Sequence, residues 1–535
     1  MSTTILIADK LAPEGAAFLA SQDGVAVIAN TGLTDDALYD ALAAADGVVV
    51  RSAVKLTEDV LRKTFERPGC RLRGIARAGV GVDNIHLPTA TALGVAVMNS
   101  ASASTITTAE HAFALLIALA RNVAASNAVF RGGGWGRSDY VGVQLSGRTL
   151  GIVGMGRIGQ AMAHRAIAFG MQVLGFDPFM HEPTALEGQV RMLDSFDEMI
   201  EQVDAVTFHV PKTDQTLGML GRDQFAMCRA GLLVVNAARG GIVDEVALIE
   251  ALDQRKCAGA AIDVYQGEPP PEDHPFRSHP RVLATPHLGA STVEAQEAVA
   301  VDACAALLRY LQGEGLDGAV NAGGLDLELD DRQKAFVDLA SRMIPLLATV
   351  TDLSAADDVN VELHGPATAG KGDTIARYAL VELLQRRCDE PVSIINVSAM
   401  AVEQGVTAST TIGQGDAVDS MAIHVNGDAA HSICGTVHSD GRPRVTDIDG
   451  HALDMVPEGN MVVLFNEDRP GMIGQVGAMF GASGINIAEM VIGRSEGASE
   501  AMMVIKADDA PSEDLLDTLR GTEGIKNPVA VAISC

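Results

Sequence analysis

The chain has 535 residues, of which 47% are hydrophobic, and a formal net charge of −30. At about 100 to 200 residues per domain, this length predicts three or four domains. The negative charge argues against nucleic acid and anionic membranes as partners, because both attract clustered Lys and Arg. The apolar run at 112–120 is shorter than the roughly 20 residues that a membrane span needs.

The seven cysteines are scattered and show no C-x-x-C spacing. This pattern predicts neither a disulfide framework nor a metal site. The N-terminal residues lack the apolar stretch of a secretory signal, so we expect a cytoplasmic protein with reduced thiols.

Up to about residue 310, short apolar runs alternate with helical stretches. The runs are TILIAD, VAVIAN, GVVVRS and RGIARAG, followed by TLGIVG, QVLGFD, AVTFHV, LLVVNAA, AAIDVY and VLATPH. Continuous apolar strands separated by helices indicate parallel sheets covered on both faces, which is α/β architecture. A long helical stretch at 105–130 divides the series, so we predict two doubly wound units. A helix from Ser291 to Leu311 is expected to lead back to the first unit.

The pattern changes at about residue 327. Helical segments at 331–350 and 373–387 accompany strand-like runs, namely VNVELHG, VSIINVS, AIHVNG and ICGTVHSDGRPRVTDIDG. We predict a separate α+β domain here. The last 76 residues or so read strand, helix, strand, strand, helix, strand, which is the order of a ferredoxin-like unit.

The run TLGIVGMGRIG places Gly154, Gly156 and Gly159 in a G-x-G-x-x-G pattern directly after a strand. Asp177 ends the next strand, at the spacing of the acid that binds a ribose 2′-hydroxyl. Together these residues predict a site for NAD rather than NADP, with the phosphates at a helix N-terminus. The alternative is a glycine-rich turn without a ligand.

Polar residues follow three later strands. Arg239 comes after LLVVNAA, Asp263 and Glu268 after AAI, and His287 ends VLATPH. Ligands bind at the carboxyl ends of the strands in such sheets, so we predict that His287 exchanges a proton, oriented by Glu268, while Arg239 grips a carboxylate. Alternatively, His287 only satisfies backbone groups.

Six motifs resemble the NAD-dependent D-2-hydroxyacid dehydrogenases, namely RAGVGVDNI, GIVGMGRIG, HVPKTDQT, NAARGGIVDE, AAIDVYQGEPP and TPHLGAST. The resemblance implies that Arg239, Glu268 and His287 form a catalytic triad. It also implies NAD contacts at Arg157, Ile158, Asp177, Val210, Ala237, Ala238, Arg239 and Asp263. In such a fold, residues 1–98 and 293–326 would bind substrate, and residues 99–292 would form the inserted NAD domain.

The same resemblance implies that Arg51, Ser52, Lys55 and Arg77 face a substrate phosphate or carboxylate; otherwise they line a solvated loop. The family usually has an Asn-Thr-Pro-x-Gly-Asn type of loop before the first helix of the NAD domain. Here Asn99 is followed by SASASTITTAE, which leaves Ser104 to donate a hydrogen bond to substrate.

The C-terminal half resembles that of the long family members that oxidise 3-phospho-D-glycerate. Residues 327–457 would form their intervening domain, and residues 458–535 would form an ACT domain. Asn466, Asp468 and Asn486 are then candidates for binding L-serine as an effector, and an ACT–ACT contact in a homotetramer is expected. The ACT domain could instead serve only for dimerisation.

These features predict the NAD-dependent oxidation of 3-phospho-D-glycerate to 3-phosphohydroxypyruvate, the first step of phosphorylated L-serine biosynthesis. Two other functions stay open. One is a dehydrogenase of another 2-hydroxy acid, such as glycerate/glyoxylate or 2-hydroxyglutarate. The other is a non-catalytic NAD-sensing protein.

Overall fold

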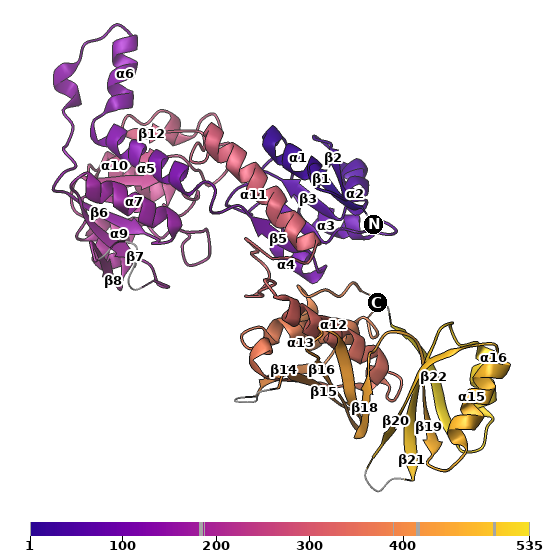
Figure 1. Ribbon diagram of the computed structural model, residues 1–535. Coiled ribbons are helices and arrows are strands. Elements are labelled where there is room, and N and C mark those ends of the chain that lie inside the picture. The colour runs from indigo at the N-terminus through magenta and orange to yellow at the C-terminus, as the bar shows by residue number, and fades with distance from the viewer. Residues whose placement is uncertain are drawn as a thin grey trace.

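A computed structural model describes residues 2–180, 186, 188–388, 390–413, 418–427, 429–495 and 499–533. The described residues form four sheets, which follow one another along the chain (Figure 1). The first two are wholly parallel, and the last two are mixed and antiparallel. The predicted fold class is therefore confirmed, with two Rossmann-like α/β units, an α+β unit and a ferredoxin-like unit.

The first sheet has the order β2-β1-β3-β4-β5. Its strands are β1 (Thr3–Ile7), β2 (Val25–Ala29), β3 (Gly47–Val50), β4 (Gly74–Arg77) and β5 (Ala96–Asn99). One face carries α2 (Asp35–Ala43), α3 (Glu58–Phe65) and α4 (Leu87–Ala92), and the other carries α1 (Pro13–Ala20) and α11 (Val293–Leu311). Helix α11 packs closely, because Cβ atoms added at Gly47 and Gly74 would lie 2.9 and 2.8 Å from Leu307. The chain thus returns to its first unit, as predicted.

The second sheet has the order β12-β11-β10-β9-β6-β7-β8, which is that of a dinucleotide-binding fold. Its strands are β6 (Thr149–Val153), β7 (Gln172–Phe176), β8 (Val190–Leu193), β9 (Ala205–Phe208), β10 (Leu232–Asn236), β11 (Cys257–Ile262) and β12 (Val282–Ala284). One face carries α5 (Thr105–Ala120) and α7 (Arg157–Ala168), and the other carries α8 (Phe196–Ile200), α9 (Arg222–Met227) and α10 (Glu245–Asp253). The strand order reverses between β6 and β9, so a crevice for ligand opens beyond their carboxyl ends.

The third sheet has the order β14-β13-β15-β16-β17-β18. It contains β13 (Asp358–His364), β14 (Thr407–Ile412), β15 (Ser420–Asn426), β16 (Ala430–Val437), β17 (Pro443–Ile448) and β18 (His451–Met455). The helices of this unit are α12 (Asp331–Leu347), α13 (Gly372–Leu384) and α14 (Val397–Glu403).

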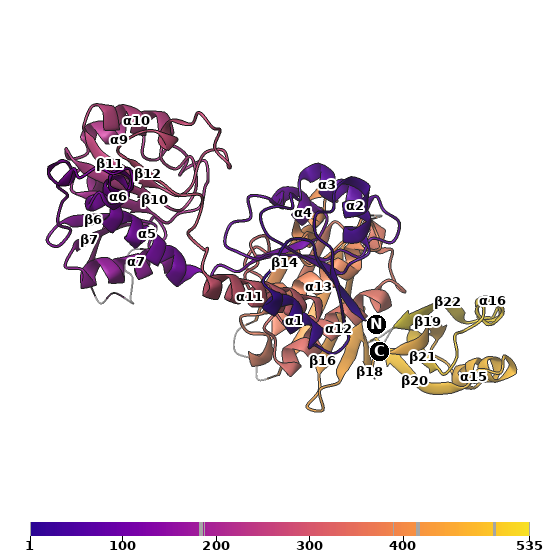
Figure 2. The same cartoon turned by 90° about the horizontal axis from the view of Figure 1, so that it is seen from above.

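The fourth sheet has the order β20-β21-β19-β22. It contains β19 (Gly459–Glu467), β20 (Ile487–Arg494), β21 (Glu500–Ala507) and β22 (Ile525–Ile533), with α15 (Met472–Ala482) and α16 (Glu513–Arg520) on one face. Figure 2 shows this last unit at the end of the molecule farthest from the second sheet.

The helical stretch predicted at 105–130 is broken. Helix α5 ends at Ala120, and α6 (Val123–Arg131) begins after Asn122, whose φ of 53° is left-handed. The two helices meet at a bend of 65°, and α6 projects from the second unit (Figure 1). In the described part of the chain, no single helix is long and apolar enough to cross a membrane. These two would meet that criterion only as a bent pair, by length and composition alone.

The strand predicted from VSIINVS is wrong. Residues 394–396 form a turn, and α14 follows from Val397. The apolar side chains are buried in the hydrophobic core that contains residues of both the first and the third unit, and two polar side chains dock on the first unit. Ser393 Oγ donates to the carbonyl of Gly94 at 2.8 Å, and Asn396 Nδ2 donates to the carbonyl of Ala92 at 2.9 Å. This turn therefore joins the third unit to the first.

Candidate active site

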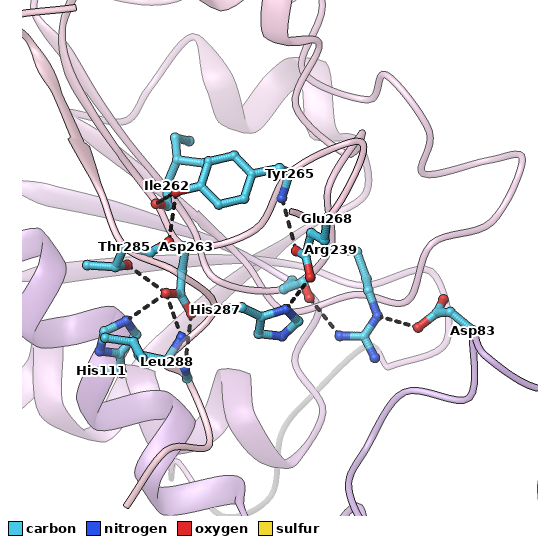
Figure 3. A network of polar contacts seen from close by, with 12 residues as sticks. Asp83, His111, Arg239, Ile262, Asp263, Tyr265, Glu268, Thr285, His287 and Leu288 are labelled. Atoms are coloured by element: carbon cyan, nitrogen blue, oxygen red, sulfur yellow. Dashed lines mark hydrogen bonds and ion pairs between the residues drawn. The ribbon is translucent and has the colours of Figure 1, made fainter. Parts of the chain in front are cut away.

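The imidazole of His287 lies against the carboxylate of Glu268, with 2.7 Å between Nδ1 and Oε2 (Figure 3). The other oxygen, Oε1, accepts the backbone N–H of Tyr265 at 3.1 Å. Burial raises the pKa of Glu268, but the hydrogen bond and charge of His287, the N–H of Tyr265 and the charge of Arg239 together outweigh burial and hold the pKa below its ordinary value. The His287 side chain is 48% exposed, so the rest of its ring is open to a ligand.

Arg239 reaches from the second unit to the first. Its Nε donates to Asp83 Oδ2 at 3.1 Å and its Nη1 donates to the carbonyl of Ala238 at 2.7 Å (Figure 3). A Cβ atom added at Gly81 would lie 1.8 Å from Nη2 of Arg239, so the guanidinium needs glycine there. Asn236 holds the turn by donating from Nδ2 to the Arg239 carbonyl at 2.9 Å. The three triad candidates thus come from loops after β10, β11 and β12.

Arg77 lies within electrostatic reach of both Arg239 and Arg51. Burial, with the charges of Arg239 and Arg51, lowers the pKa of Arg77 to about 10. Within the described residues, the buried Nε of Arg77 has no hydrogen-bond partner. Positively charged arginines close to one another, together with a buried N–H donor that has no partner, favour the binding of an anionic ligand.

The other substrate candidates divide into two groups. Ser52 and Lys55 are exposed in the loop that begins at Arg51. Ser104 is 0% exposed, and its hydroxyl has no partner among the described residues. Its role in substrate contact stays a prediction, since the structure places this hydroxyl away from the surface.

The glycine turn has the geometry that a dinucleotide requires. Gly154 has a φ of 88°, and a Cβ atom there would lie 2.6 Å from the carbonyl of His209. A Cβ at Gly159 would lie 2.0 Å from the carbonyl of Gly154, whereas one at Gly156 would meet nothing within 4 Å. The turn thus packs tightly at Gly154 and Gly159, and Gly156 leaves open space beside the start of α7.

Asp177 directly follows β7 and faces this turn. Its Oδ2 accepts the N–H of Met155 at 2.8 Å, and its Oδ1 accepts the N–H of Phe179 at 2.9 Å. The remaining cofactor candidates lie at the same edge of the sheet, at the start of α7 (Arg157, Ile158), after β9 (Val210) and after β10 (Ala237, Ala238). The residues present therefore fit a bound dinucleotide.

Asp263 is buried at 0% exposure and binds the loop that carries His287. Its Oδ1 accepts from Thr285 Oγ1 at 2.6 Å and from the N–H of Leu288 at 2.8 Å, while its Oδ2 accepts the N–H of Gly289 at 2.9 Å. Burial raises the pKa of Asp263, but His111, Thr285 and the N–H of Leu288 together outweigh burial and hold the pKa below its ordinary value. The structure thus places this predicted NAD contact beneath the catalytic loop.

Sequence reasoning missed His111 and Asp83. His111 Nε2 lies 3.2 Å from Asp263 Oδ1 (Figure 3), off the line of a hydrogen bond. The available signal was a histidine within the apolar run of α5, where a buried imidazole needs a polar partner. For Asp83 the signal was an acid inside the glycine-rich RAGVGVDNI motif.

The effector candidates do not meet within one chain. Asn466 and Asp468 lie at one end of the fourth sheet, where Asp468 Oδ2 pairs with Arg494 Nε at 2.9 Å. Asn486 lies at the other end and donates to Asp508 Oδ2 at 2.7 Å. The register spans six residues of β19 between these ends, which is about 20 Å. Asn466 is 4% exposed, and its Oδ1 has no partner in the described part of the chain.

Three family models match the chain. The NAD-binding domain of D-isomer specific 2-hydroxyacid dehydrogenases matches residues 113–289, the D-3-phosphoglycerate dehydrogenase intervening domain matches residues 332–449, and the ACT domain matches residues 460–524. These ranges contain the second, third and fourth sheets in large part. The chain is therefore an oxidoreductase with an NAD-binding domain.

Named relatives and solved structures agree with these models. D-3-phosphoglycerate dehydrogenase of Bacillus subtilis is 36% identical over 94% of each chain, and that of Methanocaldococcus jannaschii is 34% identical over 98% of this chain and 99% of the relative. A glyoxylate reductase from Paecilomyes thermophila is 27% identical with a TM-score of 0.54, covering 60% of this chain and 98% of its own. An NAD complex of formate dehydrogenase from Staphylococcus aureus is 28% identical with a TM-score of 0.51, covering 58% and 96%. The chain belongs to the D-3-phosphoglycerate dehydrogenases, the long branch of the NAD-dependent D-2-hydroxyacid dehydrogenase family that carries an intervening domain and an ACT domain.

Proposed function

We propose that the protein oxidises 3-phospho-D-glycerate to 3-phosphohydroxypyruvate with NAD. The observation that carries this proposal is the 2.7 Å contact between Glu268 and His287, with Arg239 close enough to influence the pKa of the same carboxylate. A base and a cation at one edge of a dinucleotide-binding sheet are what the oxidation of a 2-hydroxycarboxylate needs.

His287 acts as the general base. Because Glu268 occupies Nδ1, that nitrogen carries the proton and Nε2 keeps a lone pair for the substrate hydroxyl. As the hydroxyl proton moves to Nε2, the imidazolium that forms is stabilised by the Glu268 carboxylate. The planar guanidinium of Arg239 holds the substrate carboxylate by two hydrogen bonds. To do so, it gives up its hydrogen bond to Asp83 and donates to the substrate instead.

The cofactor is held by the chain's own backbone and by one acid. The turn from Gly154 to Gly159 and the N-terminus of α7 bind the pyrophosphate, and Asp177 accepts a ribose hydroxyl. NAD, when bound, accepts the hydride from C2 of the substrate. Asp177 also repels a 2′-phosphate, which favours NAD over NADP.

The phosphate of the substrate is assigned to the cations of the first unit. Arg77 lies within electrostatic reach of both Arg239 and Arg51, and Ser52 and Lys55 share the loop with Arg51. This arrangement supports a substrate with two anionic groups. It favours phosphoglycerate over glycerate and glyoxylate, which carry one anionic group each, whereas 2-hydroxyglutarate also carries two and is distinguished by the substrate panel.

A substrate panel tests the proposal. Purified protein is incubated with NAD and 3-phospho-D-glycerate, D-glycerate or D-2-hydroxyglutarate, and NADH is followed while the keto acid is trapped. We expect kcat/KM to be highest for phosphoglycerate. Turnover of unphosphorylated acids alone would indicate another hydroxyacid dehydrogenase, and NAD binding without turnover of any acid would indicate an NAD sensor.

We also propose that the ACT unit binds L-serine between two copies of the chain. The 20 Å or so between Asn486 and the pair formed by Asn466 and Asp468 supports a site that takes its residues from two subunits. Activity is titrated with L-serine and, as a control, with D-serine. Inhibition by L-serine alone is expected, and no response at saturating L-serine would leave the ACT unit as an assembly element.

Self-association as a homotetramer belongs to the same proposal. The projecting α6 and the segment after it expose Phe130 (63%), Trp135 (79%) and Val141 (81%), a large apolar surface for a monomer to leave in water. Light scattering after gel filtration gives the mass of the oligomer.

The limits proposed for the four units are 1–98 with 293–326, 99–292, 327–457 and 458–535. Limited proteolysis tests these limits.

A further inference from the structure

The loop that carries His287 is strained and depends on one buried acid. His287 has a φ of 54°, a region that residues with side chains rarely adopt. Such a conformation persists only where its surroundings fix it. Asp263 provides that support, because its carbonyl accepts the N–H of His287 at 2.9 Å and its carboxylate binds Thr285, Leu288 and Gly289 on either side.

A carboxylate at 0% exposure needs a compensating group. The hydrogen bonds to this carboxylate come from the catalytic loop itself, while the backbone N–H of Asp263 donates to the carbonyl of Asn236 at 2.9 Å and holds the main chain at the sheet. Among the described residues, His111 adds the side-chain contact from α5, with Nε2 at 3.2 Å from Oδ1. That nitrogen is buried, and within the described residues it forms no hydrogen bond of good geometry, so Asp263 is the polar group that accounts for it.

Helix α5 is well placed for this task. It begins where the chain leaves the first unit, and Thr107 Oγ1 lies 3.3 Å from Oγ1 of Thr292, which caps α11 on the way back. Figure 3 shows His111 on the side of Asp263 opposite Tyr265, which lies in the loop after β11. The loop is thus fixed between β11 and α5.

We propose that His111 is a positioning residue for the dehydrogenase reaction, acting through Asp263 to hold His287 at its hydrogen-bonded position beside Glu268. This inference rests on the proposed function. It adds that the base depends on a histidine which does not itself reach the substrate. His111→Leu removes the contact of the Asp263 carboxylate with α5, and the loop from Thr285 to Gly289 loosens.

Kinetics of three variants test the proposal. A misplaced base costs about 10- to 100-fold in rate, so His111→Leu is expected to lower kcat by that factor, with KM for the hydroxy acid within about threefold of the parent. His111→Gln, which restores a donor at the same reach, is expected to recover most of the loss. Leu116→Ala, at a fully buried position of the same helix, destabilises α5 without touching Asp263 and is expected to keep the parent kcat.

Hydrogen exchange gives a readout that does not require turnover. Amides in the peptide covering 285–292 are expected to exchange faster in His111→Leu but not in Leu116→Ala. Unchanged exchange and an unchanged kcat in His111→Leu would overturn the positioning role, as would an equal loss of kcat in Leu116→Ala. If the parent turns over no 2-hydroxy acid, the proposed function fails, while the exchange data still decide whether His111 holds the loop.

Discussion

Glu268 accepts from His287 at 2.7 Å through one carboxylate oxygen and from the backbone of Tyr265 through the other. Both oxygens are therefore engaged, and the carboxylate cannot turn away from the ring. The arrangement resembles that of a base which is held in one tautomer by a fixed acid. The orientation of the His287 ring therefore depends on Glu268, which does not itself contact the substrate in the proposed mechanism.

Replacement of the base should separate chemistry from cofactor binding. We expect His287→Ala to lower kcat by roughly 10² to 10⁴, the usual contribution of a general base. NAD affinity, measured by calorimetry, should stay close to that of the parent because the glycine turn is untouched. A variant that kept near-normal turnover would remove His287 from the mechanism.

Two glycines of the cofactor turn should respond differently to alanine. Gly159→Ala forces a methyl group against the Gly154 carbonyl at 2.0 Å, so the free protein should lose stability by about 1 to 3 kcal/mol. Gly156→Ala meets open space in the free protein and should unfold like the parent, yet bind NAD more weakly because the methyl group enters the proposed pyrophosphate site. Thermal melts and NAD titrations of both variants check this. Equal melting temperatures would contradict it.

The acid after β7 should set the choice of cofactor. Asp177→Ala removes the charge that opposes a 2′-phosphate, so the ratio of kcat/KM for NADP to that for NAD should rise by about tenfold or more. Part of the change will be a loss of NAD affinity, because the ribose hydroxyl loses its acceptor. Wild-type protein that preferred NADP would show that Asp177 does not have this role.

The buried acid beneath the catalytic loop should make stability depend on pH. The folded-state pKa of Asp263 is lowered, so its contribution is present above the unfolded value of about 3.9 and is lost as the pH falls through the folded value. Asp263→Asn removes this contribution. The difference in unfolding free energy between parent and variant, from urea titrations, should be largest above about pH 5 and shrink toward pH 3. A difference independent of pH would show that folding does not lower the pKa of Asp263.

The net charge of −30 should make stability depend on salt. Self-repulsion of the folded chain is screened as the Debye length falls from about 10 Å at 0.1 M to about 3 Å at 1 M salt. The melting temperature should therefore rise between these concentrations of NaCl. A melting temperature that fell over the same range would indicate that attractive ion pairs dominate.

Much of the fold could be predicted from periodicity, because each parallel strand is a short apolar run and each functional side chain directly follows one. That rule found Arg239, Glu268 and His287. It missed β5, β8, β14 and β18, all of which are edge strands. It also failed at the break after α5, since no proline or glycine marks Asn122.

Contacts between distant segments could not be predicted in the same way. The pairing of His111 with Asp263 joins residues 152 positions apart, and that of Arg239 with Asp83 spans 156. Likewise, VSIINVS has the composition of a strand, yet its apolar residues are buried against another unit. Local pattern shows that a side chain needs burial or a partner, but it does not show which surface supplies it.

The amide of Asn396 is 1% exposed and donates to the first unit, and one hydrophobic core contains residues of the first, third and fourth units, among them Ile5 and Ile533. A chain cut near residue 327 would leave the carbonyl of Ala92 without this donor and would expose apolar side chains of the first unit that belong to the shared core. Grafting the catalytic half of this protein onto a different regulator would therefore require redesign of the face that the first and third units share.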